Sequence, residues 1–236
     1  MTLALFLVLL ACCDAGIVVA GFFWLKVSTA IRLAVGIAAW LTYVGMFGYY
    51  GLAAYVAGRL PGIILLFAPI VIFIVFGVAR SRTGRDVAVA LPFGFLIGAQ
   101  VFRLGVELIL HQLSAEGVVP RMLTFEGSNL DVWIGLSAPI VAWIASQRRI
   151  GPAVAMIWTI VGLLSLANVM VRSVLSAPGP LKLIATEVPN LVVSTFPYIF
   201  IPGFLAPLGI VLHVLTLRSL RAERARGVSG GVGSAA

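Results

Sequence analysis

The sequence has few charged residues, only two histidines and only two cysteines. Charged residues make up 10% of the 236 positions, whereas hydrophobic residues make up 61%. Soluble domains carry about 25% charged residues, because a water-soluble fold must cover its surface with polar groups. The shortage of charge excludes an ordinary soluble domain and predicts an integral membrane protein.

The two cysteines do not indicate a metal site or a disulfide. Cys12 and Cys13 are adjacent inside the first apolar run, so they provide neither a zinc-ligand spacing nor a disulfide framework. No basic residue precedes that run, which therefore lacks the positively charged start of a cleaved signal peptide. We expect the run to remain as a membrane span.

Long uncharged runs, bounded by glycine, proline and charge, predict an all-α integral membrane protein, a bundle of about seven transmembrane helices. Each run is near the length of about 20 residues that crosses a bilayer. They form one transmembrane domain, 1–217, with helices at about 2–25, 31–57, 61–79, 87–112, 130–146, 152–174 and 191–217. The remaining segment, 218–236, is basic and then Gly/Ser-rich, and we expect it to be a disordered cytoplasmic tail.

The basic residues are concentrated in alternate loops. Short loops rich in Lys and Arg stay in the cytoplasm, so the pattern predicts an N-terminus outside, a C-terminus in the cytoplasm, and a bacterial cytoplasmic membrane as the location. Orientation in a lipid bilayer thus explains the net charge of +8, and we expect no nucleic acid partner. The basic residues on the predicted inner side are Lys26, Arg32, Arg80, Arg82, Arg85, Arg148, Arg149, Arg218, Arg221, Arg224 and Arg226.

Polar residues gather in the second half of the fourth predicted helix. Gln100, Arg103, Glu107 and His111 project within an arc of about 80° on a helix and form what we call the polar stripe. A charge at mid-bilayer costs about 2.5–3.5 kcal/mol, so each needs a partner or a purpose. The predicted direction of the helix places the stripe in the outer half of the membrane.

Other segments place polar groups at the same predicted depth, and we expect several of them to converge on one site. Asn129 could instead cap the helix that follows it. Asp14 stands alone in the first helix and is a candidate for proton coupling or a hydrogen-bonded packing residue. The candidate ligand-binding residues outside the stripe are Glu126, Asn129, Asp131, Asn168, Arg172, Asn190 and Tyr198.

The leading hypothesis is a polar pocket that faces the extracytoplasmic side and binds a small polar or anionic molecule for transport or sensing. Arg103 and Arg172 would contact its anionic group, while Glu107 and His111 would gate or exchange protons. A simpler interpretation makes Arg103 and Glu107, at i and i+4, an internal salt bridge.

Two other functions use the same residues. A membrane-embedded enzyme, such as a metal-dependent hydrolase, would use Glu107 or His111 as a catalytic general base. A structural or assembly subunit would instead pair the polar stripe with a helix of a protein partner.

The sequence offers little support for a cofactor. Glu107 and His111 are one turn apart and are weak metal-ligand candidates, with Glu126 or Asp131 as further ligands, but no HExxH motif or third histidine accompanies them. The last predicted helix has no lysine for a retinal Schiff base. Haem between two histidines is also not expected, because His111 and His213 lie near opposite ends of the predicted bundle.

Overall fold

The computed structural model describes residues 1–54, 62–147, 150–179, 181–191 and 194–232, and all regular elements within these ranges are helical. The end of the predicted span 31–57, the first residue of the span 61–79, Arg148, Arg149 and the last four residues of the predicted tail lie outside the described residues. The prediction of an all-helical chain is confirmed.

The elements follow one another along the chain without long insertions. They are α1 (Thr2–Trp24), α2 (Val27–Tyr49), α3 (Ile63–Ile72), the π-helix η1 (Phe73–Arg80), α4 (Arg82–Ala90), α5 (Phe93–Gly98), the 3₁₀-helix η2 (Ala99–Val101), α6 (Phe102–Ala115), the 3₁₀-helix η3 (Arg121–Leu123), α7 (Asp131–Ala145), α8 (Gly151–Ser176), the π-helix η5 (Ile201–Leu205) and α9 (Ala206–Val232).

Within the described residues, six helical stretches are long and apolar enough to cross a membrane. Three of them are single helices and three join consecutive elements. Among the seven predicted spans, α7 is the exception. It is apolar but has only 15 residues, or about 22 Å at 1.5 Å per residue, against a hydrocarbon core of about 30 Å. The six stretches are Thr2–Trp24, Val27–Tyr49, Ile63–Arg80, Phe93–Ala115, Gly151–Ser176 and Ile201–Ala225.

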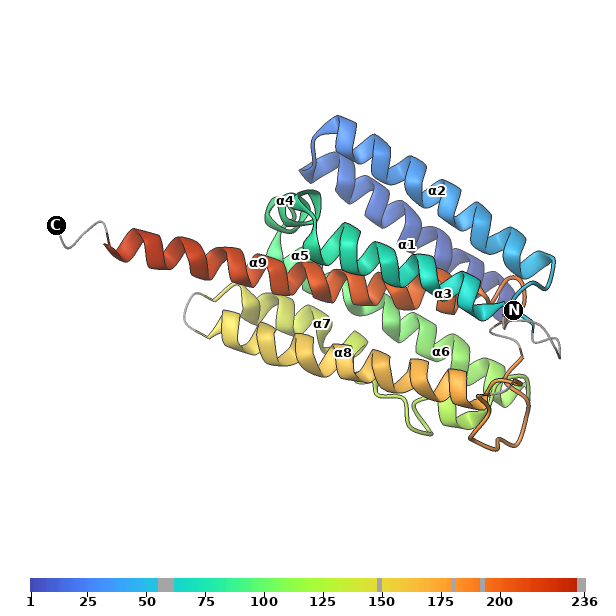
Figure 1. Ribbon diagram of the computed structural model, residues 1–236. Helices are drawn as coiled ribbons and strands as arrows, with labels where there is room; N and C mark the ends of the chain where they lie inside the picture. The colour runs from blue at the N-terminus through green and yellow to red at the C-terminus, as the bar shows by residue number, and fades with distance from the viewer. Residues whose placement is uncertain (55–61, 148–149, 180, 192–193, 233–236) are drawn as a thin grey trace.

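Helix α9 lies at the centre of the bundle, with α1, α2 and α3 on one side and α6, α7 and α8 on the other (Figure 1). In its most apolar 18-residue stretch 61% of the residues are buried, against 17% in α1 and in α2. The outer faces of α1 and α2 expose large apolar side chains such as Phe23 and Val35. Such faces suit contact with lipid tails rather than with water.

The predicted fourth span, 87–112, is divided in the structure. Helix α4 ends at Ala90, Leu91 is extended with φ −77° and ψ 135°, and Pro92 precedes α5. The ring of a proline disfavours the helical conformation of the residue before it, so the helix cannot continue through Leu91. Figure 1 shows α4 end-on, whereas the bundle helices are seen from the side.

The last predicted span, 191–217, is displaced along the chain. Its long helix begins only at Ile201, after turns around Pro197, and continues to Val232. Arg218 donates hydrogen bonds to the backbone carbonyls of Val78 and Ser81, the latter at 2.9 Å, and Leu220 is buried. The first residues of the predicted tail, 218–236, are therefore part of the folded bundle.

Two side chains of helix α2 donate hydrogen bonds to backbone carbonyls in α3 and η5. Each carbonyl lies four residues before a proline, which cannot donate an N–H to it. Pro69 in α3 and Pro207 in α9 have no N–H to donate to the carbonyls of Leu65 and Gly203, four residues earlier. The Tyr43 hydroxyl donates to Leu65 O at 3.1 Å, and Trp40 Nε1 donates to Gly203 O at 2.8 Å. These two aromatic side chains, with ring centroids 5.2 Å apart, connect α2 to both helices.

Candidate functional site

A buried ion pair joins α6 to the first residue of α7. Arg103, 2% exposed, makes a bidentate contact with Asp131, with Nε 3.2 Å from Oδ2 and Nη2 bonded to Oδ1. The close approach of the two helices depends on Gly135, because a Cβ there would lie 2.4 Å from the backbone nitrogen of Leu104. Bidentate charge-assisted pairs are among the strongest polar contacts in proteins.

The other donors of Arg103 also have protein partners. Nη1 lies 3.1 Å from Nε2 of His213, and Nη2 lies 3.3 Å from the carbonyl oxygen of Gly162. Gly162 must lack a side chain, since a Cβ would come within 2.3 Å of His213 Nε2. Ser165 donates to Asp131 Oδ1, so the ion pair is held by α8 and α9 as well.

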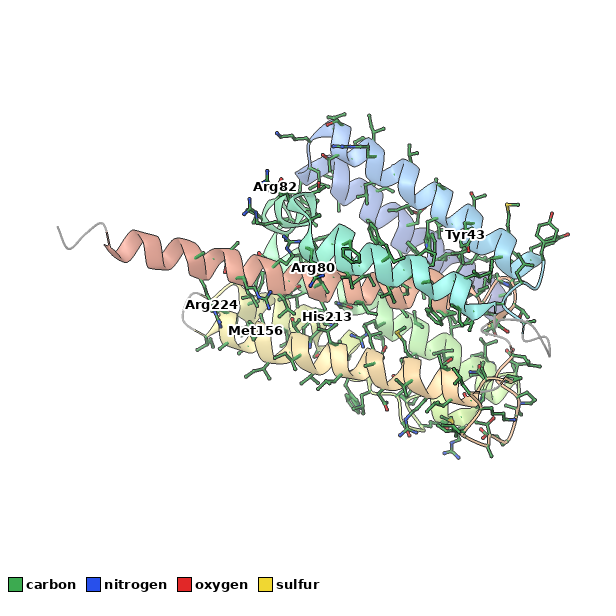
Figure 2. All side chains as sticks on the ribbon, in the orientation of Figure 1. Tyr43, Arg80, Arg82, Met156, His213 and Arg224 are labelled. Carbon is green, nitrogen blue, oxygen red and sulfur yellow. The ribbon has the colours of Figure 1, made fainter. Side chains whose placement is uncertain are left out.

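His213 is fully buried in this cluster, packed against Trp158 with ring centroids 5.3 Å apart. Figure 2 shows it on α9, inside the bundle. The contact of His213 with Arg103 could not be predicted from the sequence, because the two residues are 110 positions apart and meet only through the packing of the bundle.

These contacts correct two expectations about Arg103. It pairs with Asp131 rather than forming the i, i+4 salt bridge with Glu107, and all three of its side-chain nitrogens contact groups of the protein. Arg103 is therefore committed to the fold and does not present a free guanidinium to an anionic ligand.

Glu107 is the other buried charged residue of the polar stripe, at 1% exposure. Its Oε1 accepts a hydrogen bond from Asn129 Nδ2, and the backbone N–H of Phe125 also interacts with the carboxylate. Oε2 has no hydrogen-bond partner among the described residues. Asn129 in turn accepts from the backbone N–H of Asp131 at 3.0 Å. This is a turn contact with the first residue of α7 rather than the predicted N-cap, because Leu130 occupies the N-cap position and no side chain caps the helix.

The polar stripe is split by the structure. Gln100 is fully buried and donates to the carbonyl of Gly209 on α9 at 3.0 Å. His111 instead lies at the surface, with 37% of its side chain exposed, Nδ1 3.8 Å from Glu126 Oε1 and its ring 4.8 Å from that of Phe125. His111 is thus held by the loop after α6, apart from the buried cluster.

The remaining candidates make local contacts near the ends of helices. Arg172 Nε donates to Asn168 Oδ1 at 2.9 Å, and Asn168 Nδ2 donates to Ser128 O at 2.7 Å. No hydrogen bond among the described residues links Arg172 to Arg103. Glu126 pairs with Arg121 at 3.2 Å.

Tyr198 packs its ring on Phe6, with centroids 5.1 Å apart, and partial burial raises the pKa of its hydroxyl. Asp14 is half-buried in α1, and its Oδ1 has no hydrogen-bond partner within the described part of the chain. Neither residue joins the cluster around Arg103 through a described hydrogen bond.

Two surface carboxylates fasten chain segments near the α6 end of the bundle. The Thr2 hydroxyl donates to Glu116 at 2.7 Å, and this hydrogen bond lowers the pKa of Glu116. Glu187 accepts from the backbone N–H of Arg121, which lowers the pKa of Glu187. Both bonds are complete above the ordinary carboxyl pKa of 4.5 and are lost as the pH falls through the lowered values.

The described residues contain no group of three or more His, Cys, Asp or Glu side chains that could hold a metal ion. Glu107 contacts Asn129, whereas His111 contacts Glu126 and Phe125. The pair proposed from its spacing therefore lacks the further ligands that a protein metal site requires.

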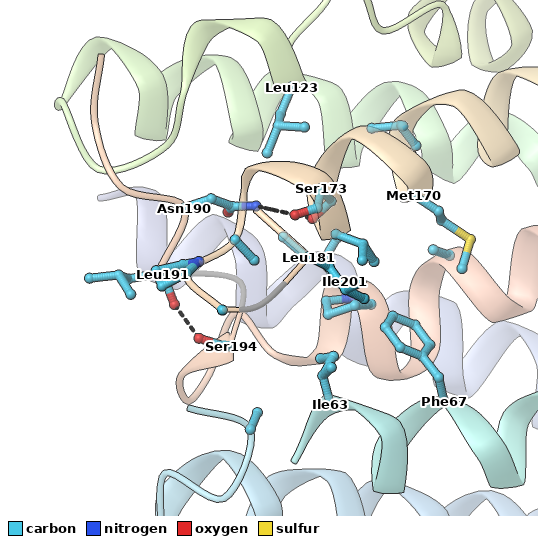
Figure 3. Close-up of a pocket in the computed structure, with 18 of the residues that line it drawn as sticks. Ile63, Phe67, Leu123, Met170, Ser173, Leu181, Asn190, Leu191, Ser194 and Ile201 are labelled. Carbon is cyan, nitrogen blue, oxygen red and sulfur yellow. Dashed lines mark hydrogen bonds between the residues drawn. The ribbon is translucent and has the colours of Figure 1, made fainter. Parts of the chain in front are cut away.

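Two adjoining cavities border the buried cluster. The larger, of about 220 Å³, is a groove with α3 and α8 as its walls and η5 as its floor (Figure 3). The residues between α8 and η5 that line it are Ala177, Pro178, Gly179, Leu181, Asn190, Leu191 and Ser194. The smaller, of about 50 Å³, is bordered by Arg103, Glu107, Asn129 and Asp131. The residues that line both are Leu110, Val169, Ile201 and Ala206.

The groove is mostly apolar but contains one buried amide. Asn190, 1% exposed, donates through Nδ2 to Ser173 O at 3.0 Å and to Ser176 Oγ at 3.2 Å. Its Oδ1 has no hydrogen-bond partner in the ranges that the structure describes. Asn190 was a sequence candidate, and the structure places it at the groove rather than at the ion pair.

Fold and site together define an all-helical chain with six helices of membrane-spanning character around a buried Arg–Asp ion pair. Residues 60–221, more than half of the chain, match the family described as Domain of unknown function (DUF8737). The chain belongs to this family. No curated protein and no solved structure matched it.

Proposed function

We propose that this protein binds a small polar molecule within the membrane, for transport or sensing, in the groove between α3 and α8. The observation that supports this most directly concerns Glu107. Its carboxylate is fully buried, its Oε2 has no hydrogen-bond partner among the described residues, and the residue borders the small cavity that adjoins the groove. A polar atom without a partner in such a place is costly unless something else satisfies it.

The size and lining of the groove suit this role. Its volume of about 220 Å³ exceeds that of an engineered cavity of about 150 Å³ that holds benzene. Apolar walls with a few polar groups are the usual composition of small-molecule sites. An anionic ligand is not favoured, because the guanidinium of Arg103 that would bind it is paired with Asp131.

The rival functions receive less support. A metal-dependent hydrolase with Glu107 or His111 as general base would need further metal ligands, and the described residues contain no group of three or more His, Cys, Asp or Glu side chains that could hold a metal ion. An assembly subunit would present the polar stripe to a partner helix, whereas Gln100, Arg103 and Glu107 are buried among helices of this chain.

We further propose that the chain crosses a bacterial cytoplasmic membrane seven times, with α7 as the short seventh span and the N-terminus outside. The α1–α2 turn, α4 and the C-terminal part of α9 lie at the same end of the bundle (Figure 1). This end holds Lys26, Arg82, Arg85, Arg221 and Arg224, as expected for a cytoplasmic face.

The binding proposal can be tested by filling the groove. Ala206→Leu adds volume at the boundary of the two cavities, and Ala15→Leu makes the same change on the exposed face of α1. A ligand that binds the native state raises the unfolding temperature. In detergent, 2-phenylethanol should raise it for the wild type and Ala15→Leu but not for Ala206→Leu, measured by tryptophan fluorescence.

All three proteins share the same micelle, so partitioning of the probe into detergent affects them equally. An equal shift in all three proteins would contradict binding in the groove.

A further inference from the structure

Among the described residues that line the cavities, two buried side-chain atoms lack a hydrogen-bond partner, and both are acceptors. They are Oε2 of Glu107 and Oδ1 of Asn190, each on a side chain that is 1% exposed. The amide donors beside them are used within the chain: the Asn129 amide bonds Glu107 and Leu123, and the Asn190 amide bonds Ser173 and Ser176. A ligand that completes this site must therefore donate hydrogen bonds.

The charges of the cluster point the same way. The single positive charge of Arg103 is matched by Asp131 in a bidentate contact. Glu107 contacts a neutral amide and a backbone N–H instead, so its carboxylate has no counter-charge of its own. A buried carboxylate without one is costly, and a bound cation would remove that cost.

The sizes and linings of the two cavities predict a ligand with a small polar part and a larger apolar part. The smaller cavity, about 50 Å³, exceeds the 10–15 Å³ or so that one water molecule needs, so it has room for an ammonium group. The larger groove is lined by apolar side chains such as Phe67, Met170 and Ile201 (Figure 3). It would hold an apolar body attached to that group.

We propose, building on the binding function above, that the ligand is a protonated amine with a hydrocarbon body. Its nitrogen lies at Glu107, and its hydrocarbon part lies between α3 and α8. Asn190 offers a second acceptor to a ligand with a further donor.

Three probes of one shape test the charge of the ligand: 2-phenylethylamine, which is protonated at pH 7.5, 2-phenylethanol and phenylacetate. Their dissociation constants are obtained from the concentration dependence of the unfolding temperature of the full chain in detergent. We expect the amine to bind the wild type about tenfold more tightly than the alcohol, because charge-assisted hydrogen bonds are roughly twice as strong as neutral ones. Phenylacetate should not bind.

Glu107→Gln should reduce the affinity for the amine to that for the alcohol, whereas Glu126→Gln, on an exposed carboxylate, should leave the tenfold preference intact. An alcohol or acid that binds the wild type as tightly as the amine would overturn the proposal even if Glu107→Gln does not fold. So would an amine preference that persists in Glu107→Gln.

The outcomes separate this proposal from the one on which it rests. If the alcohol distinguishes the wild type from Ala206→Leu but the amine has no advantage, the groove binds ligands and only the charge assignment fails. If neither probe distinguishes these two proteins, binding in the groove itself fails.

Discussion

The fate of Arg103 shows how a buried charge can be structural although its position suggests a ligand. Its guanidinium contacts Asp131, His213 and the Gly162 carbonyl, which come from α7, α9 and α8. Removing one member of a buried pair leaves the other unpaired, at a cost of about 3–5 kcal/mol, whereas replacing both with apolar residues is often tolerated.

Arg103→Leu and Asp131→Leu should each strongly destabilise the protein, and the double variant should lose less stability than the sum of the two. Unfolding in detergent, followed by tryptophan fluorescence, measures this coupling. Arg172→Leu, whose described partner is the nearby Asn168, serves as the control and should have a small effect. A folded Arg103→Leu protein of wild-type stability would contradict the structural role of the ion pair.

At this scale the sequence identified most of the polar residues but not their pairing. Helical spacing placed Gln100, Arg103 and Glu107 on one face, which the structure buries. It could not show that Asp131, at the start of the predicted helix 130–146, lies beside Arg103, because that contact depends on tertiary packing. The spacing of Gly162, Ser165 and Asn168 along α8 is a signal that could have indicated a second polar face.

At the scale of elements, α2 stabilises two helices that proline interrupts. In a membrane a carbonyl without a donor has no water to replace it, so the bonds from Trp40 to η5 and from Tyr43 to α3 matter more than they would at a wet surface. Because α3 and η5 also form the groove, the same bonds help to set its shape.

Tyr43→Phe keeps the ring but removes the donor, and Trp40→Phe removes the donor and replaces the indole with a smaller aromatic ring. Each should lower stability by about 1–2 kcal/mol, seen as a lower unfolding temperature in detergent. Tyr49→Phe removes a hydroxyl from a side chain that is 75% exposed and should be nearly neutral. Equal unfolding temperatures for all three variants and the wild type would show that the two bonds contribute nothing.

Hydropathy predicted the existence of the long helices well and their interruptions poorly. The predicted runs 2–25 and 152–174 match α1 and α8 within a few residues, whereas α2 begins four residues before the predicted 31–57 and ends eight residues before its end. The break at Leu91 and the late start of the last helix arise from Pro92 and Pro197, whose local effect a hydropathy average does not register.

At the scale of the whole molecule, the distribution of charge gives the bundle two different ends. Ala115 lies at the C-terminal end of α6 and Thr83 in α4, and both are exposed. In a chain whose Cys12 and Cys13 are replaced by alanine, Ala115→Cys should react with a membrane-impermeant maleimide in intact cells, and Thr83→Cys only after the cells are permeabilised. The reverse pattern would contradict the proposed orientation.

The family match begins at residue 60, after α1 and α2. The ion pair, Glu107 and most of the groove therefore lie within the family region, whereas Trp40 and Tyr43 lie outside it. The function proposed for the groove thus rests mainly on residues of the family region. Helix α2, outside that region, donates hydrogen bonds to two of the elements that form the groove.

The most direct test of the central claim is the number of ligand molecules that one chain binds. Equilibrium dialysis of the purified protein with radiolabelled 2-phenylethylamine should give one saturable site per chain in the wild type, and none in Ala206→Leu. Uptake that does not saturate, or that is the same in both proteins, would show that the groove beside Glu107 is not a binding site.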